Sequence, residues 1–148
     1  MKQKPLFTVD GETLTTTLLP PVRFVVEGFI PQGLHLLAGA SKIGKSWLAL
    51  WLCLQVEKGE KVWNFPSRRG DVLYLCLEDN YSRIQSRLLD ITDTAPGNLH
   101  FATASEKLRC GLEQQIQQFL AGHPHTVLVV IDTLQRVRGA GGDTNAYA

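Results

Sequence analysis

Short apolar runs and stretches of helical periodicity alternate along this chain. Near-continuous apolar runs occupy residues 34–38, 72–77 and 126–131, and such runs are typical of parallel strands that are covered on both faces of a sheet. A weaker run at 99–103 predicts another strand, and residues 61–63 predict a short one. The chain therefore supplies strands for one mostly parallel sheet.

Helical segments separate these runs. Residues 46–57 are apolar on almost every side, which predicts a helix buried between the sheet and another layer, ended by Lys58 and Gly59. The next two helices each carry one apolar face: Ile84, Leu88, Leu89 and Ile91 in the first, and Leu108, Leu112, Ile116, Phe119 and Leu120 in the second. Strands that alternate with helices in this way predict an α/β fold, a three-layer sandwich with a mostly parallel sheet.

The two ends of the chain lack this alternation. Residues 1–20 are polar and rich in threonine, and we expect an N-terminal arm or an edge strand there. Residues 22–30 favour β structure, and residues 139–143 predict a glycine-rich loop. We therefore expect an arm at 1–20 followed by a single domain at 21–148.

Composition excludes several classes of protein. The net charge is +1, so no overall charge favours binding to nucleic acid or to an acidic membrane surface. No segment has the pattern of a signal peptide or the length of a membrane span. Cys53, Cys76 and Cys110 lack the short spacing of a zinc or redox motif, so we expect reduced thiols in a cytoplasmic protein.

The segment after the first apolar run has the pattern of a phosphate-binding loop. All of its residues are predicted to bind nucleotide, and they are Gly39, Ala40, Ser41, Lys42, Ile43, Gly44, Lys45 and Ser46. Glycines let backbone N–H groups point at a phosphate, and the N-terminus of the following helix adds its dipole. We expect Lys45 to reach the terminal phosphates of ATP and Ser46 to ligate Mg²⁺, while Lys42 either adds charge there or is solvated.

Two predicted strands end in acidic residues. In an open α/β sheet the ligand lies beyond the carboxyl ends of the strands, where such residues meet. Asp132 follows the strand at 126–131, and we expect it to hold Mg²⁺ through a water molecule, as a Walker B aspartate does. Glu78 and Asp79 follow the strand at 72–77. We assign Glu78 as the catalytic base that activates the attacking water, and Asp79 as a helix cap or a supporting residue.

Three motifs together resemble a known family. The phosphate loop, the segment LCLEDN at 75–80 and the segment VVIDTL at 129–134 are similar in order and spacing to the RecA-like P-loop ATPases with an AAA-type domain. They resemble most closely the plasmid RepA family of hexameric helicases. The resemblance spans about residues 25–148 and implies that Glu78 is catalytic and that Asp132 belongs to Walker B. It also implies hexameric rings, single-stranded DNA as a partner, and ATP hydrolysis that drives helicase or replication work.

The resemblance also predicts that parts of the domain are missing. Members of the family place a further strand in the middle of the sheet, between the phosphate-loop strand and the Walker B strand. DNA-facing loops and an arginine that completes a neighbouring site follow in those proteins. Since this chain stops at Ala148, we expect a truncated or split RecA-like domain that lacks the central strand and turns over ATP slowly or not at all.

Two other functions stay open at this point. A non-catalytic nucleotide-binding module that regulates a larger relative would use the same loop but would not depend on Glu78. A small-molecule kinase also carries a phosphate loop, but it needs a lid with arginines, and only a short segment follows Asp132. A kinase would also leave Glu78 without a role.

Overall fold

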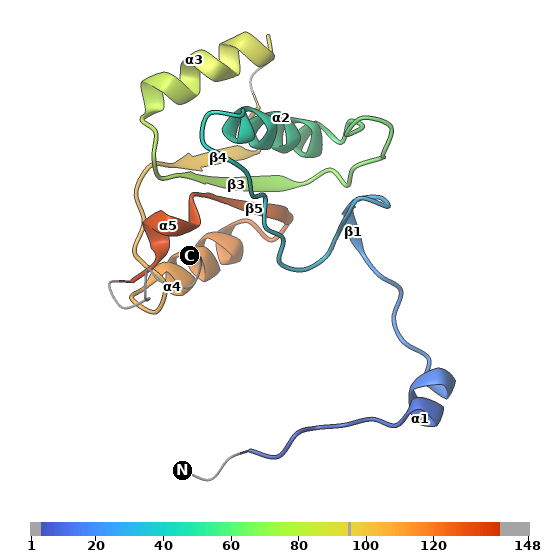
Figure 1. The fold of residues 1–148 in the computed structure, drawn as a ribbon. Helices are drawn as coiled ribbons and strands as arrows, with labels where there is room; N and C mark the ends of the chain where they lie inside the picture. Colours follow the sequence, from blue (N-terminus) through green and yellow to red (C-terminus); the bar gives the residue numbers. More distant parts are fainter. Residues whose placement is uncertain (1–3, 95, 140–148) are drawn as a thin grey trace.

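A three-stranded parallel sheet forms the centre of the computed structural model, which describes residues 4–94 and 96–139 (Figure 1). In this sheet β3 (Asp71–Cys76) lies between β4 (Leu99–Ala102) and β5 (Thr126–Asp132). Cys76 pairs with Asp132 in the register of β3 and β5, so the carboxyl ends of these two strands are level. The apolar runs at 72–77, 99–103 and 126–131 therefore form strands as predicted.

Helices cover both faces of the sheet. Figure 1 shows α2 (Lys45–Lys58) and α3 (Tyr81–Ile91) on one face, and α4 (Leu112–Gly122) with the short α5 (Leu134–Val137) on the other. This arrangement confirms the predicted α/β fold with a parallel sheet. α4 begins four residues later than the apolar pattern predicted, because Leu108 lies in the turn before it.

The side chains of β3 alternate between two apolar clusters. Val72, Tyr74 and Cys76 pack with the buried face of α2, and Leu73 and Leu75 pack with α4 and α5. Each such side chain, when fully buried, contributes roughly 1.5–3 kcal/mol. Burial on both faces explains why the sequence of this strand is apolar without interruption.

Two predicted strands are wrong. Residues 34–38 form no strand, and the side chains of Leu34, Leu36 and Leu37 are 92%, 76% and 57% exposed. An apolar run becomes a strand only where a neighbouring strand accepts its backbone hydrogen bonds. Within the described part of the chain no strand pairs with residues 34–38, and β5 pairs with β3 alone. The short strand expected at 61–63 is reduced to an isolated bridge in which Val62 pairs with Phe65.

The N-terminal segment extends away from the sheet (Figure 1). It contains α1 (Gly11–Thr16), which is capped by Asp10 and buries no residue. A small antiparallel hairpin of β1 (Phe24–Val26) and β2 (Ile30–Pro31) then joins this segment to the domain. No helix in residues 4–94 and 96–139 is long and apolar enough to cross a membrane. Apart from Gly139, the loop predicted at 139–143 lies outside the described residues.

The end of α2 gives a test of the fold. Gly59 terminates this helix in the left-handed conformation (φ 71°), and a Cβ atom there would lie 2.8 Å from Cβ of Arg69. We expect Gly59→Ala to lower the free energy of unfolding by about 1–2 kcal/mol, measured by urea denaturation. Gly122→Ala is the control, since Gly122 ends α4 with no atom within 4 Å of an added Cβ. Equal effects of the two substitutions would contradict this account of the turn.

Candidate functional site

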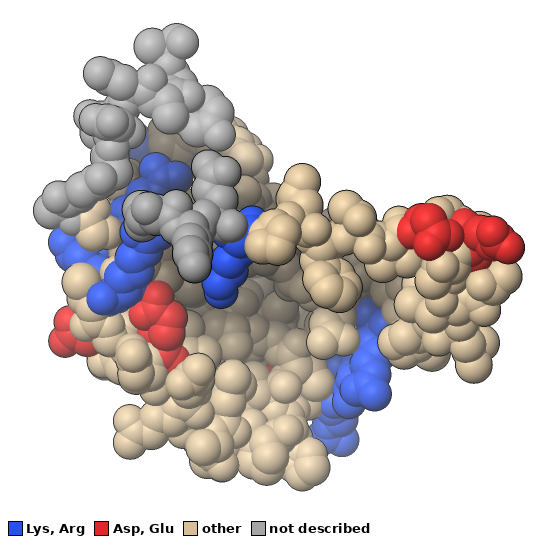
Figure 2. All heavy atoms as spheres, turned by 90° about the horizontal axis from the view of Figure 1, so that it is seen from below, with Lys and Arg blue, Asp and Glu red and all other residues tan. Residues whose placement is uncertain are grey.

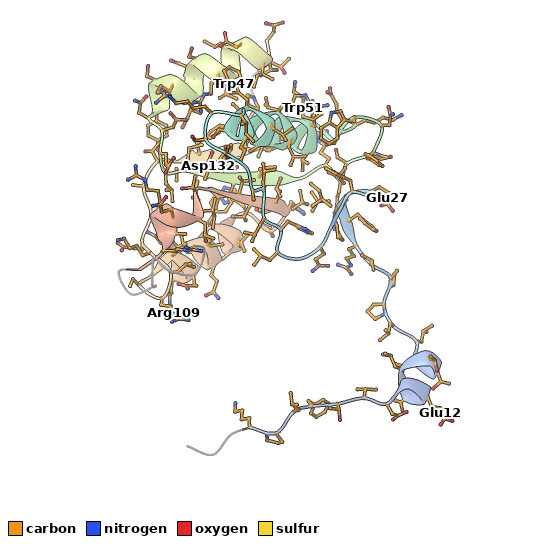
Figure 3. All side chains as sticks on the ribbon, in the orientation of Figure 1. Glu12, Glu27, Trp47, Trp51, Arg109 and Asp132 are labelled. Atoms are coloured by element: carbon orange, nitrogen blue, oxygen red, sulfur yellow. The ribbon has the colours of Figure 1, made fainter. Side chains whose placement is uncertain are left out.

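A polar pocket lies beyond the carboxyl ends of β3 and β5. It has a volume of about 200 Å³. Its lining residues come from α2, β3, β5, α3 and the turn before α3, and they are Ser46, Cys76, Glu78, Asp79, Arg83, Arg87 and Asp132. Figure 3 labels Asp132 at this end of the sheet, beneath α2. The pocket therefore brings together residues from all three of the motifs that the sequence pointed to.

The predicted phosphate loop leads into the first turn of α2. Gly44 precedes this helix in the left-handed conformation (φ 90°), and Lys42 is also left-handed (φ 64°). The Lys45 ammonium folds back over the loop and donates to the carbonyl oxygens of Gly39 at 2.7 Å and Ala40 at 2.5 Å. The loop thus curls around the end of its own lysine side chain, at the N-terminus of a helix of 14 residues. Lys42 and Ile43 are exposed in this loop.

Ser46 and Asp132 meet at the base of the pocket. The Ser46 hydroxyl donates to Oδ2 of Asp132 at 2.6 Å, although 86 positions separate the two residues in the sequence. A hydroxyl and a carboxylate are both oxygen donors of the kind that Mg²⁺ prefers, and Mg²⁺ usually takes its other ligands from water and substrate phosphates. The two residues predicted to hold the metal therefore fit it in chemistry and position.

The charge of Asp132 also suits a cation. Its carboxylate is partly buried and accepts hydrogen bonds from two neutral hydroxyl groups, those of Ser46 and Tyr74. Among residues 4–94 and 96–139, no lysine or arginine forms an ion pair with it. A partly buried carboxylate without a charged neighbour attracts a cation more strongly than one that is already paired.

Glu78 lies on the rim of the same pocket. Its side chain is 48% exposed, and its Oε1 atom accepts hydrogen bonds from Thr133 Oγ1 at 3.1 Å and from Arg136 Nε at 3.4 Å. The ion pair with Arg136 contributes little to stability, because both partners are exposed to solvent. Glu78 is therefore tethered to the segment after β5 and can still turn toward the pocket.

Asp79 does not cap α3, which corrects one of the two roles expected for it. Asn80 is the cap and accepts from the Arg83 backbone N–H at 2.9 Å. The Asp79 carboxylate instead forms ion pairs with Arg83, at 3.1 Å, and with Arg87. The Arg87 guanidinium also lies over the Trp47 ring, 5.7 Å from its centroid, and thereby links α3 to α2. Asp79 thus supports the wall of the pocket.

Two residues of β3 beside Asp132 were not predicted to act at the site: Cys76, which lines the pocket, and Tyr74, which reaches Asp132 from the core. Burial raises the pKa of the Cys76 thiol to about 12, and the charges of Asp132 and Asp79 add to this effect, so Cys76 is a neutral thiol and not a nucleophile. Burial also raises the pKa of the Tyr74 phenol, again with a contribution from Asp132, so Tyr74 stays a hydrogen-bond donor. No local signal in this uninterrupted apolar run separates the two residues from their neighbours, and the register of β3 with β5 brings both to Asp132.

Comparison with known proteins places the domain in a family. The chain matches the family model described as "AAA domain" over residues 3–148. No curated protein and no solved structure matches it. The match covers nearly the whole chain and agrees with the phosphate loop and the acidic strand ends that meet in the pocket. This chain belongs to the AAA domain family, and it is a nucleotide-binding domain of the ATPase type.

Proposed function

We propose that this domain binds ATP with Mg²⁺ at residues 39–46 and hydrolyses it with a water molecule that Glu78 activates. The hydrogen bond between Ser46 and Asp132 carries this proposal. It joins the end of the phosphate loop to the end of β5 in one pocket, with Glu78 on the rim. Hydrolysis of a terminal phosphate needs a loop that binds the phosphates, a metal site and a base, all facing the same pocket.

The loop and Lys45 would bind the phosphates. The backbone N–H groups at the start of α2 and the helix dipole favour a negative charge there. The Lys45 ammonium lies on two loop carbonyls and would exchange them for phosphate oxygens, which are stronger acceptors because they are charged. Ser46 and Asp132 would hold Mg²⁺, Asp132 through water, and the bound metal supplies positive charge that stabilises the transferred phosphoryl group.

Glu78 would take the proton from the attacking water. Glu78 and Ser46 line the same pocket, so a phosphate bound at the end of the loop would place its attacking water near this carboxylate. To do so, Glu78 must give up at least part of its contact with Arg136, and an exposed ion pair of this kind costs at most about 1 kcal/mol to break. Thr133 can keep its hydrogen bond to Glu78 and hold the side chain in place.

We extend the proposal to DNA-linked work in an oligomer, as the likeness to plasmid RepA helicases implies. On the face in Figure 2 the Lys and Arg side chains form separate groups on either side of a hollow that is mostly uncharged. A second cleft, of about 260 Å³, lies at the amino end of β5 and is lined by Arg23, Arg68 and Arg69 with no acidic residue. This cleft is the best place in the described residues for the phosphate backbone of single-stranded DNA.

Two observations support the expectation that the sheet lacks a central strand. The apolar side chains of residues 34–38 are exposed beside the phosphate loop, and within the described residues β5 pairs on one edge only. An added strand would satisfy the backbone groups of that edge and cover the apolar side chains. We therefore expect hydrolysis by this chain alone to be slow, even where ATP binding is intact.

A non-catalytic, nucleotide-dependent regulatory module is the second candidate. The contact of Glu78 with both Arg136 and Thr133 favours it, because these groups hold the carboxylate at the rim. The two candidates share the nucleotide site and differ in whether Glu78 acts on water.

Lys45→Ala tests the nucleotide site itself. Loss of one charge-assisted hydrogen bond to phosphate costs roughly 1.5–3 kcal/mol, so we expect the affinity for ATP to fall about 10- to 150-fold. The measurement is isothermal titration of the full chain with ATP and Mg²⁺. Lys61→Ala, which removes an exposed lysine outside the pocket, should bind as the wild type does. Equal affinities in the two variants would place the nucleotide elsewhere.

Glu78→Gln separates the two candidate functions. If Glu78 is the base, this substitution lowers the hydrolysis rate about 10²- to 10⁴-fold, while the affinity for ATP stays within about threefold of the wild type. Release of phosphate under single-turnover conditions is the measurement, and Glu60→Gln is the control on an exposed glutamate outside the pocket. Equal rates of phosphate release in the wild type and in Glu78→Gln, with ATP binding intact in both, would support the regulatory module instead.

A further inference from the structure

Tyr74 touches the site from inside the core and has no part in the chemistry proposed above. Its side chain is 2% exposed, and its ring packs against Phe101 of β4 with the ring centroids 6.0 Å apart. Its hydroxyl donates to Oδ2 of Asp132 at 3.0 Å. A phenylalanine would fill almost the same space, so packing alone does not account for the hydroxyl.

The pairing of β3 with β5 brings the Tyr74 hydroxyl to the Asp132 carboxylate. Tyr74 lies opposite Val130, and Cys76 lies opposite Asp132. Tyr74 and Cys76 belong to the face of β3 that packs with α2. The phenol therefore reaches from β3 to the neighbouring strand β5, where Asp132 lies two residues beyond Val130. It meets the Asp132 carboxylate from the side of the core.

The two hydrogen bonds to Asp132 differ in how firmly they are held. Ser46 and Tyr74 both donate to the same oxygen, Oδ2, at 2.6 Å and 3.0 Å. If Ser46 ligates Mg²⁺ as proposed, it does so through an oxygen lone pair and can still donate its proton to Asp132, but its oxygen then has to follow the metal. Tyr74 is fixed by a buried strand and keeps its hydrogen bond, and a carboxylate anchored at Oδ2 leaves Oδ1 free for the pocket.

We propose that Tyr74 is a positioning residue of the Mg²⁺ site, whose hydroxyl fixes the orientation in which the Asp132 carboxylate holds a metal-bound water. The inference rests on the proposed function, since it assigns Asp132 to the metal. Partners that orient a metal-binding group typically change metal affinity 10- to 100-fold when they are removed. Because Asp132 acts through water here, we expect an effect near the lower end of that range.

The test compares the affinity for ATP in EDTA with that in saturating Mg²⁺, using the full chain and isothermal titration. The ratio of the two dissociation constants gives the tightening due to Mg²⁺. Tyr74→Phe should leave the dissociation constant for ATP in EDTA within about twofold of the wild-type value. It should reduce the Mg²⁺-dependent tightening about tenfold. Phe101→Leu is the matched control, because it disturbs the same ring packing and keeps the hydroxyl. It should lower the melting temperature and leave the tightening unchanged.

A double-mutant cycle with Asp132→Asn gives a second reading that does not depend on stability. In the Asp132→Asn background, Tyr74→Phe should cause no further loss of the Mg²⁺-dependent tightening, because both changes remove the same function.

Equal Mg²⁺-dependent tightening in the wild type and Tyr74→Phe would overturn the inference and leave the proposed function standing. So would a loss of affinity that is equal in EDTA and in Mg²⁺, which would indicate a structural role. A wild-type chain that binds no ATP in either condition would overturn the proposed function, and this inference with it.

Discussion

The hydrogen bond from Ser46 to Asp132, at 2.6 Å, joins two parts of the chain that lie 86 positions apart. A hydrogen bond to a carboxylate contributes roughly 1.5–3 kcal/mol, which is too little to hold two such distant segments together by itself. Its geometry is set by larger forces, namely the packing of α2 against β3 and the pairing of β3 with β5. Because that pairing makes the strand ends level, Glu78 follows β3 at the same edge where β5 delivers Asp132. The packing of α2 on β3 and the pairing of β3 with β5 therefore place the phosphate loop relative to both acids, and the hydrogen bond from Ser46 to Asp132 reports that placement.

The negative charges of the three acidic residues of the pocket have different partners, and the differences match the roles that we propose for these residues. Asp79 is paired with two arginines of α3 and serves as part of the wall. Glu78 has a solvent-exposed partner in Arg136, a weak pairing that leaves the carboxylate free to act as a base. Asp132 receives only neutral hydroxyl groups in the described part of the chain, so its charge is available to a cation. One pocket thus contains three carboxylates whose surroundings suit the structural, catalytic and metal-binding roles that we propose for them.

The sequence was sufficient for those parts of the site that depend on local pattern. The runs at 72–77 and 126–131 became strands because each packs apolar side chains on both faces of the sheet, and the acid after each run then had to lie at the common edge. Residues 34–38 have an equally apolar pattern, yet a strand also needs a partner, and no local signal tells whether one is present. Tyr74 was missed because its ring counts as apolar in such a run, and its hydroxyl finds Asp132 only through the register between strands. Asp79 and Asn80 are both good caps, and the arginines of α3 decided between them.

The most direct test of the central claim is a crystal structure of the chain with Mg²⁺ and a non-hydrolysable ATP analogue. The account predicts that Lys45 Nζ leaves the carbonyl oxygens of Gly39 and Ala40 for oxygens of the terminal phosphates. It also predicts that Ser46 Oγ ligates Mg²⁺ while Asp132 contacts a water on the metal and keeps its hydrogen bond to Tyr74. A nucleotide bound away from residues 39–46, or one bound there with Lys45 still on the loop carbonyls and Mg²⁺ far from Ser46 and Asp132, would contradict it.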